Sequence, residues 1–247
     1  MKKIILSLSV GALILGMSGC GSSGDSKPDA NSINIEFKTS GTFDLAQYIT
    51  ADKDQSNNYV KKVYTNNKGK KDYKDTADKT TYPVKTITHT SDISVEEFID
   101  GKLDSTYSFL ADRIKTTDDV NNTDIIARFA NKGDYISKSV KTITSDGLPI
   151  HYEMVCKLSK KLDSKTVLAK DYQDVIQVVC TYNSSANSSI NNSAITYTSN
   201  GVNTIYAAKG IGTILDINED CSETKVGDAT PVKECQKEVE EITSVIK

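Results

Sequence analysis

Two histidines, five cysteines and a set of acidic clusters are the residues of this chain that could do chemistry. The histidines, His89 and His151, are not spaced as a metal-binding pair such as His-x-x-x-His. His151 alternates onto the polar face of a predicted strand beside Glu153, which favours a solvated surface histidine over a general base. No Gly-x-Ser-x-Gly sequence marks a nucleophile, although the members of a Ser–His–Asp triad need not be close in sequence. The sequence therefore predicts no catalytic residue.

The acidic clusters give no better candidate for a metal site. Residues 216–220 begin with alternating oxygen ligands, like a calcium loop, but Cys221 stands where such a loop needs Gly and Gly227 where it needs Glu. We expect an ordinary acidic turn there. Paired carboxylates such as Glu96-Glu97 are expected in solvated turns and at strand edges. The sequence predicts no metal and no cofactor.

Composition narrows the class of protein. The chain has 247 residues, with 30 Lys and Arg against 33 Asp and Glu, so it lacks the basic footprint of a nucleic-acid-binding protein. Only one apolar run is long enough to meet a bilayer, which excludes a polytopic helical membrane protein.

That apolar run lies at the N-terminus. Lys2 and Lys3 precede the apolar residues 4–16, which are too few to span a bilayer comfortably and have the length typical of a signal peptide. The run ends at Met17-Ser18-Gly19-Cys20, which resembles the lipobox of bacterial lipoproteins, with Met where Leu is commoner. The resemblance implies that residues 1–19 are removed and that Cys20 becomes a lipidated N-terminus. The alternative is an ordinary secretory signal with a leftover Cys.

The segment after Cys20 is small and polar. Residues 20–32 lack periodicity and predict a flexible tether, followed by a single domain over residues 33–247. By resemblance, acyl chains on Cys20 hold the protein to a membrane of the bacterial envelope, and Gly21 favours the outer membrane, facing the periplasm. Asn121 stands in a pattern similar to a bacterial glycosylation acceptor, which chance alone explains.

From residue 33 onward, apolar residues recur with period two between turn dipeptides. Asp100-Gly101, Asn131-Lys132-Gly133, Asp146-Gly147 and Asn200-Gly201 supply the positive φ angles of tight turns and predict four hairpins. We expect an antiparallel meander of about ten strands. Residues 183–193, rich in Ser and Asn, are expected to form a loop.

The strand predicted over residues 148–158 has one apolar and one polar face. A sheet covered on one side must curl or receive a lid, so the predicted fold is mainly β, a meander curling into an open or half barrel. Residues 43–49 are one candidate lid. The other is a short C-terminal helix over residues 232–246, introduced by Thr230-Pro231 and carrying apolar residues at helical spacing.

The four cysteines after Cys20 form an even set in a protein expected to be exported to an oxidising compartment. Cys156 and Cys180 lie on the apolar faces of successive predicted strands. Cys221 and Cys235 flank a turn-rich segment. We predict the disulfides Cys156–Cys180 and Cys221–Cys235.

A second resemblance concerns residues 206–214, whose Tyr-x-x-x-Gly-x-Gly pattern looks like the closing segment of β-sheet periplasmic lipoproteins, some with half-barrels reminiscent of the carriers LolA and LolB. It transfers no binding residue. Three functions then compete: a non-catalytic binding or scaffolding module with a protein partner, a carrier of a lipid or other apolar ligand, and a hydrolase with an unrecognised site. A lipid-sized apolar cavity would favour the carrier, and a filled core the binding module.

Overall fold

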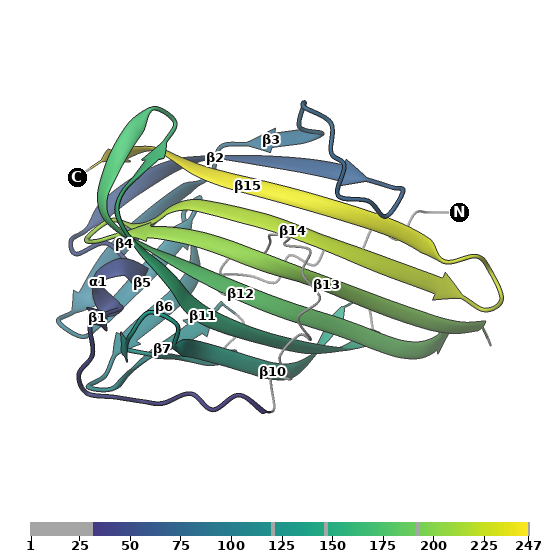
Figure 1. Cartoon of the computed structure of the whole chain (residues 1–247), viewed down its shortest axis with the longest axis horizontal. Helices are drawn as coiled ribbons and strands as arrows, with labels where there is room; N and C mark the ends of the chain where they lie inside the picture. Colours follow the sequence, from purple (N-terminus) through teal and green to yellow (C-terminus); the bar gives the residue numbers. More distant parts are fainter. Residues whose placement is uncertain (1–31, 120–121, 146–147, 191–192, 247) are drawn as a thin grey trace.

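Twelve antiparallel strands of the described chain close into a barrel, because the last strand pairs with the first long one (Figure 1). This is a computed structural model, and it describes residues 32–119, 122–145, 148–190 and 193–246. The predicted signal peptide, Cys20, most of the tether, Asn121 and the Asp146-Gly147 turn lie outside the described residues.

The strands follow one another around the barrel in chain order. They are β2 (Gln55–Asn66), β4 (Val84–Ser91), β5 (Ser94–Ile99), β6 (Lys102–Phe109), β7 (Arg113–Asp118), β8 (Thr123–Ala127), β10 (Tyr135–Ser145), β11 (Leu148–Val167), β12 (Lys170–Ile190), β13 (Ser193–Ala208), β14 (Gly212–Val226) and β15 (Val232–Ile246).

Three short strands and one helix complete the fold. The strand β3 (Lys79–Thr81) pairs with β2, while β1 (Phe43–Asp44) and β9 (Phe129–Ala130) pair with each other. The helix α1 (Ala46–Ile49) has four residues. Among the described residues, no helix has the length and apolar character needed to cross a bilayer.

The predicted antiparallel, curling sheet is confirmed, and it curls as far as closure. Asp100 and Gly101, with φ of 49° and 80°, turn the chain from β5 to β6. Gly133, with φ of 96°, serves the turn before β10. Gly210 and Gly212 (φ 69° and 89°) flank the turn from β13 to β14, where the positive φ angles favour glycine.

The expected C-terminal helix over residues 232–246 is wrong, because this segment is the strand β15. Its two edges pair with β14 and with β2, and these two ladders close the barrel. The residues Gln236, Glu238 and Glu240 share one face of β15 and line up with inward-facing residues of β2 and β14. Charged residues on an inward face hide the apolar alternation that normally reveals a strand.

Two expectations in the long hairpin of β12 and β13 are also wrong. Asn200-Gly201 does not turn the chain but lies within β13, and the expected loop over residues 183–193 is largely strand, since β12 runs to Ile190. Gly201 pairs with Tyr182 of β12, and a Cβ at residue 201 would lie 2.5 Å from the Tyr182 ring. Gly201 therefore makes room for an aromatic ring that lies across the sheet.

An apolar core fills the barrel beside α1. Leu45 and Tyr48, from the segment expected as a lid, are 1% and 5% exposed and pack into this core. Leu45 N–H donates to Arg128 O at 2.7 Å, and Tyr48 Oη donates to Asp174 Oδ1 at 2.8 Å. Residues 43–49 therefore do cover apolar interior, as one of the two proposed lids should.

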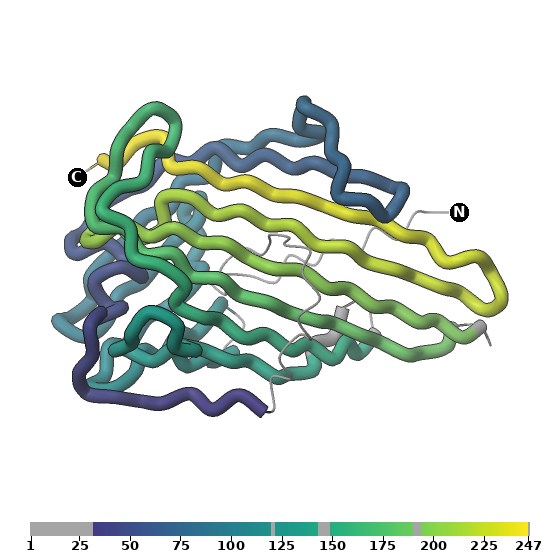
Figure 2. The backbone as a smooth tube through the Cα atoms, in the orientation of Figure 1, coloured from purple at the N-terminus to yellow at the C-terminus, as the bar shows by residue number. Residues whose placement is uncertain are grey.

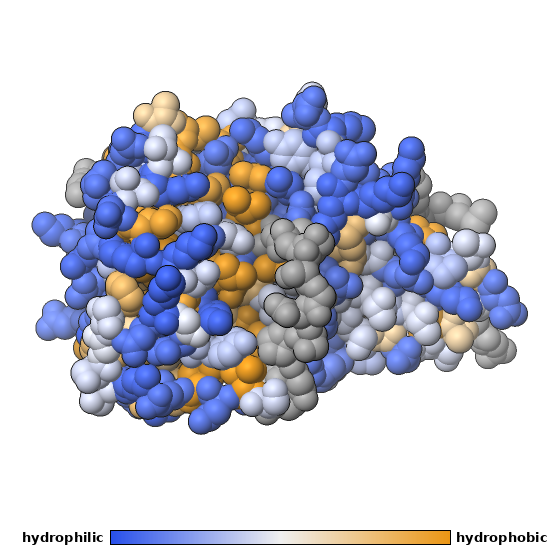
Figure 3. Space-filling model, in the orientation of Figure 1, coloured by the Kyte–Doolittle hydropathy of each residue, from blue (hydrophilic) through white to orange (hydrophobic). Residues whose placement is uncertain are grey.

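A second apolar cluster joins the hairpin of β11 and β12 to its neighbouring strands. Figure 2 shows this hairpin rising beyond the other strands on the side of the C-terminus. Val167 and Tyr172 near its tip pack with Val175 and Leu215. In Figure 3, apolar side chains gather on the face that carries β12, β13 and β14, within a mostly polar surface.

Both predicted cysteine pairs lie at disulfide distance. Cys156 and Cys180 are direct register partners on β11 and β12, with Cα atoms 3.9 Å apart. Cys221 and Cys235 are direct partners on β14 and β15, with Cα atoms 4.0 Å apart. The first pair packs in the apolar core and the second joins the two strands next to the barrel closure.

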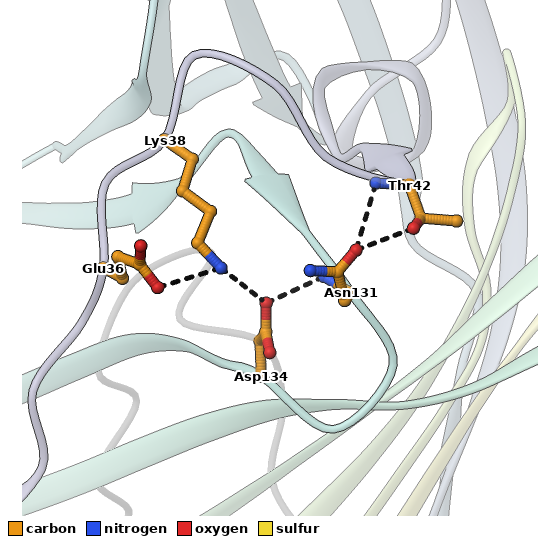
Figure 4. A network of polar contacts seen from close by, with 5 residues as sticks. All are labelled: Glu36, Lys38, Thr42, Asn131 and Asp134. Atoms are coloured by element: carbon orange, nitrogen blue, oxygen red, sulfur yellow. Dashed lines mark hydrogen bonds and ion pairs between the residues drawn. The ribbon is translucent and has the colours of Figure 1, made fainter.

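The chain before β1 is fastened to the turn between β9 and β10 (Figure 4). Lys38 Nζ lies 2.9 Å from Glu36 Oε2 and 3.4 Å from Asp134 Oδ2. Asn131 N–H donates to Asp134 at 2.9 Å, and the Thr42 hydroxyl donates to Asn131 Oδ1 at 2.6 Å. These contacts fix the start of the folded domain.

Candidate functional site

Polar and charged side chains gather inside the barrel, near the end covered by α1. Asn57 pairs with Lys85 across β2 and β4, and Glu97 pairs with Ser105 across β5 and β6. On the opposite wall, Asp216 of β14 pairs with Glu240 of β15. Direct partners share one face of the sheet. Asn57, Lys85, Glu97 and Asp216 line one cavity inside the barrel, so the shared face is the inward one.

A bulge in β5 and β6 brings in one further carboxyl. The register shifts between Glu97 and Phe98, so that Asp104 has no opposite residue on β5. Asp104 then lines the same interior as Glu97.

The ammonium of Lys85 is held from two sides. It forms an ion pair with Glu240, and each of the two side chains is 15% exposed. It also lies 4.6 Å from the centre of the Tyr59 ring, whose hydroxyl donates to Thr213 O at 2.7 Å. Burial lowers the pKa of Lys85, but the carboxylate of Glu240, with Tyr59 and Glu97, more than offsets this and raises it well above its ordinary value.

The other carboxyls are buried without such a partner. Burial raises the pKa of Glu97 to about 7, against the opposing effect of Lys85 and with a contribution from Asp104. Burial raises the pKa of Asp104 to about 6, again opposed by Lys85. The pKa of Asp216 is raised well above its ordinary value by burial and by Glu240. Glu97 and Asp104 therefore exchange protons closer to neutral pH than ordinary carboxyls do.

These groups enclose a cavity of about 60 Å³, here called the acidic cavity. Its polar lining consists of Asn57, Tyr59, Lys85, Glu97, Asp104 and Asp216. Glu97 Oε1, Asp104 Oδ2 and Asp216 Oδ1 are buried there without a hydrogen-bond partner. The lining is completed by Ile49 at the end of α1, by Thr50, Ile87 and Ile99, and by residues 211–213 where the chain turns from β13 into β14.

The main chain fixes this end of the cavity. Gly210 N–H donates to Gln47 O at 2.8 Å, and Asp52 N–H donates to Gly210 O at 3.4 Å. A Cβ at residue 212 would lie 3.5 Å from Ile49 O, so the turn is in contact with the end of α1 and with Thr50. The helix and the turn therefore form one rim.

No family model, curated protein or solved structure matches this chain. The chemistry of the cavity must therefore be argued from its own atoms. The atoms of the cavity that could ligate a metal ion are carboxyl and amide oxygens, which hard cations prefer. However, no three acidic, histidine or cysteine residues in the described ranges are placed to hold a metal ion. The cavity offers hydrogen-bond acceptors and negative charge.

The residues singled out in the sequence lie elsewhere. His89 Nδ1 lies 2.9 Å from Asp54 Oδ1, and His151 Nε2 lies 3.0 Å from Glu153 Oε1. The His151 side chain is 50% exposed, so the expected surface histidine is confirmed. The structure brings the members of each predicted cysteine pair together. Neither histidine lines the acidic cavity.

The residues of the cavity were missed because each has an ordinary local sequence. Glu97 was expected at a solvated position and is instead 5% exposed. Residues 216–220 were expected as an acidic turn and instead belong to β14. The usable signal was the alternation of Asp216, Asn218 and Asp220 on one side of a strand, which indicates a polar inward face.

Proposed function

We propose that this chain is a lipid-anchored protein of the bacterial envelope that acts as a non-catalytic binding or scaffolding module on the periplasmic side of the membrane. The N-terminal apolar run and the lipobox-like residues ending in Cys20 support the anchor. The two cysteine pairs at disulfide distance support export, because such bonds persist in oxidising compartments.

The filled interior of the barrel favours a binding or scaffolding module over a lipid carrier. Tyr107, Tyr152, Met154, Leu158 and Tyr182 point into the core and are at most 7% exposed. The acidic cavity measures about 60 Å³, whereas pockets for lipid-sized ligands measure a few hundred Å³. A barrel filled by its own side chains leaves its outer face and its rims for recognition.

The anchor is tested by growing cells with radiolabelled palmitate. We expect the label in the wild-type protein and none in Cys20→Ser, because the thioether cannot form without the thiol. The variant should leave the membrane fraction or remain unprocessed. An unlabelled wild-type protein contradicts the anchor.

The binding role is tested by native mass spectrometry of the full chain extracted in mild detergent. We expect a mass that the polypeptide and the acyl chains on Cys20 account for. A further lipid bound in equal amount would contradict the filled core and support a carrier.

A further inference from the structure

Three carboxyl oxygens of residues that line the acidic cavity have no hydrogen-bond partner. Glu97 is 5% exposed, and its Oε1 atom has no hydrogen-bond partner. Asp104 and Asp216 are half-buried residues, but their Oδ2 and Oδ1 atoms, respectively, are also buried without a partner, and all three side chains line the cavity. Buried polar atoms in folded proteins are nearly always paired, so three in one cavity indicate a missing donor.

The lysine of the cavity does not supply that donor. Lys85 is committed to the Glu240 carboxylate and lies over the Tyr59 ring. When ionised, Glu97, Asp104 and Asp216 therefore have no cation of their own among the residues that line the cavity. Water could donate hydrogen bonds to these oxygens but would leave their charge unbalanced, whereas a cation with N–H groups would do both.

The spacing of the carboxyls favours an organic cation over a metal ion. Metal ligation requires several oxygens within about 2.3–2.6 Å of one point for calcium. No three acidic side chains in the described ranges meet that requirement. An ammonium has three donors, each reaching an acceptor at about 2.8 Å in its own direction, so it bridges oxygens that stand further apart.

The size and place of the cavity limit the ligand further. A volume of about 60 Å³ accommodates a charged head group with a few carbons rather than a lipid chain. The rim formed by Ile49, Thr50 and the turn from β13 to β14 presents main chain, two threonines and the aliphatic side chains of Ile49 and Ile211, and the aliphatic part is suited to a short alkyl group.

We propose that the acidic cavity binds a small primary ammonium compound, whose N–H groups donate to Glu97, Asp104 and Asp216. This inference rests on the proposed binding role but not on the lipid anchor. Loss of amine binding with palmitate labelling intact would refute the inference alone.

The test uses the full chain in mild detergent, titrated with propylammonium chloride while backbone amide resonances are recorded. We expect saturable shifts at concentrations below about 10 mM, centred on Glu97, Ile99 and Gly212. The uncharged analogue 1-propanol should leave these resonances in place. Equal shifts with propanol, or no saturable shift with the amine, would overturn the proposal.

Variants locate the binding. Glu97→Gln and, separately, Asp104→Asn should weaken propylammonium binding at least tenfold, since each removes one charged acceptor. Asp220→Asn is the matched control, because Asp220 is a half-buried carboxyl on the inner face of β14 that does not line the cavity. We expect less than a twofold effect from it. Equal weakening by Asp220→Asn, or shifts at the same residues with calcium but not with the amine, would contradict an ammonium site.

Discussion

Replacing Glu97 by Gln should make the protein more stable in alkaline solution. The carboxyl lies buried with one oxygen unpartnered, and Lys85 compensates its charge only in part because Lys85 is paired with Glu240. An amide of nearly the same shape avoids the cost of burying that charge. The substitution therefore removes a liability that depends on pH.

The size of the effect follows from the shift in the pKa of Glu97, from an ordinary 4.5 to about 7. Between these values the folded protein keeps a proton that the unfolded chain has released. Stability from this group is therefore fully present below about pH 4.5 and is lost as the pH rises through 7. At about 1.4 kcal/mol per pH unit, the loss amounts to about 3 kcal/mol, which the Gln variant does not suffer.

The assay is urea unfolding of wild type and Glu97→Gln at pH 4 and at pH 8, with disulfides intact. We expect the stability of the variant relative to wild type to increase by about 3 kcal/mol between the two pH values. Glu96→Gln, on the opposite face of β5, is the control and should show no such change. Parallel pH profiles for wild type and Glu97→Gln would refute the reasoning.

Three further outcomes follow from the packing. Gly201→Ala should cost about 1–3 kcal/mol in urea unfolding, because its Cβ would lie 2.5 Å from the Tyr182 ring, and in a Tyr182→Ala background the cost should largely vanish. The double variant Cys221→Ser with Cys235→Ser should lose about 3 kcal/mol in the free energy of unfolding, since the bond closes a short loop with a sequence separation of 14. Four alkylatable thiols in the native wild-type protein would show that the two disulfides do not form. Lys85→Met should cost about 3 kcal/mol at pH 8 by leaving Glu240 buried without its cation, and an unchanged midpoint would show that the pair contributes nothing.

The sequence was sufficient wherever apolar alternation and turn chemistry agreed. The strand over residues 148–158 and its partner around Cys180 were recognisable from alternation, and their register places Cys156 directly opposite Cys180. Asp100 and Gly101 adopt the positive φ angles expected of them. These features are local, and local sequence decides them.

The failures share a physical cause, which is that a distant strand decides the outcome. Asn200-Gly201 has the composition of a turn, but the ring of Tyr182 on the neighbouring strand requires the glycine. The segment 232–246 has helical spacing, but two strand edges, one from each end of the chain, take it up as β15. The local sequence predicts a solvated position for Glu97, but the opposite wall of the barrel, formed by β14 and β15, encloses its side chain. Pairings at such separations leave no local trace.

The closure between β2 and β15 has a consequence for how the chain is made. β2 comes early in the chain and β15 last, so when the chain emerges from its N-terminus one edge of β2 lacks its ladder until the final strand arrives. An open edge of this kind invites pairing with other chains, and lysines on such an edge discourage it. β2 carries Lys61 and Lys62 there, and in the finished barrel they meet Glu238 and Glu241 at 2.5 and 3.2 Å. The charges that guard the nascent edge thus also select the strand that finally covers it.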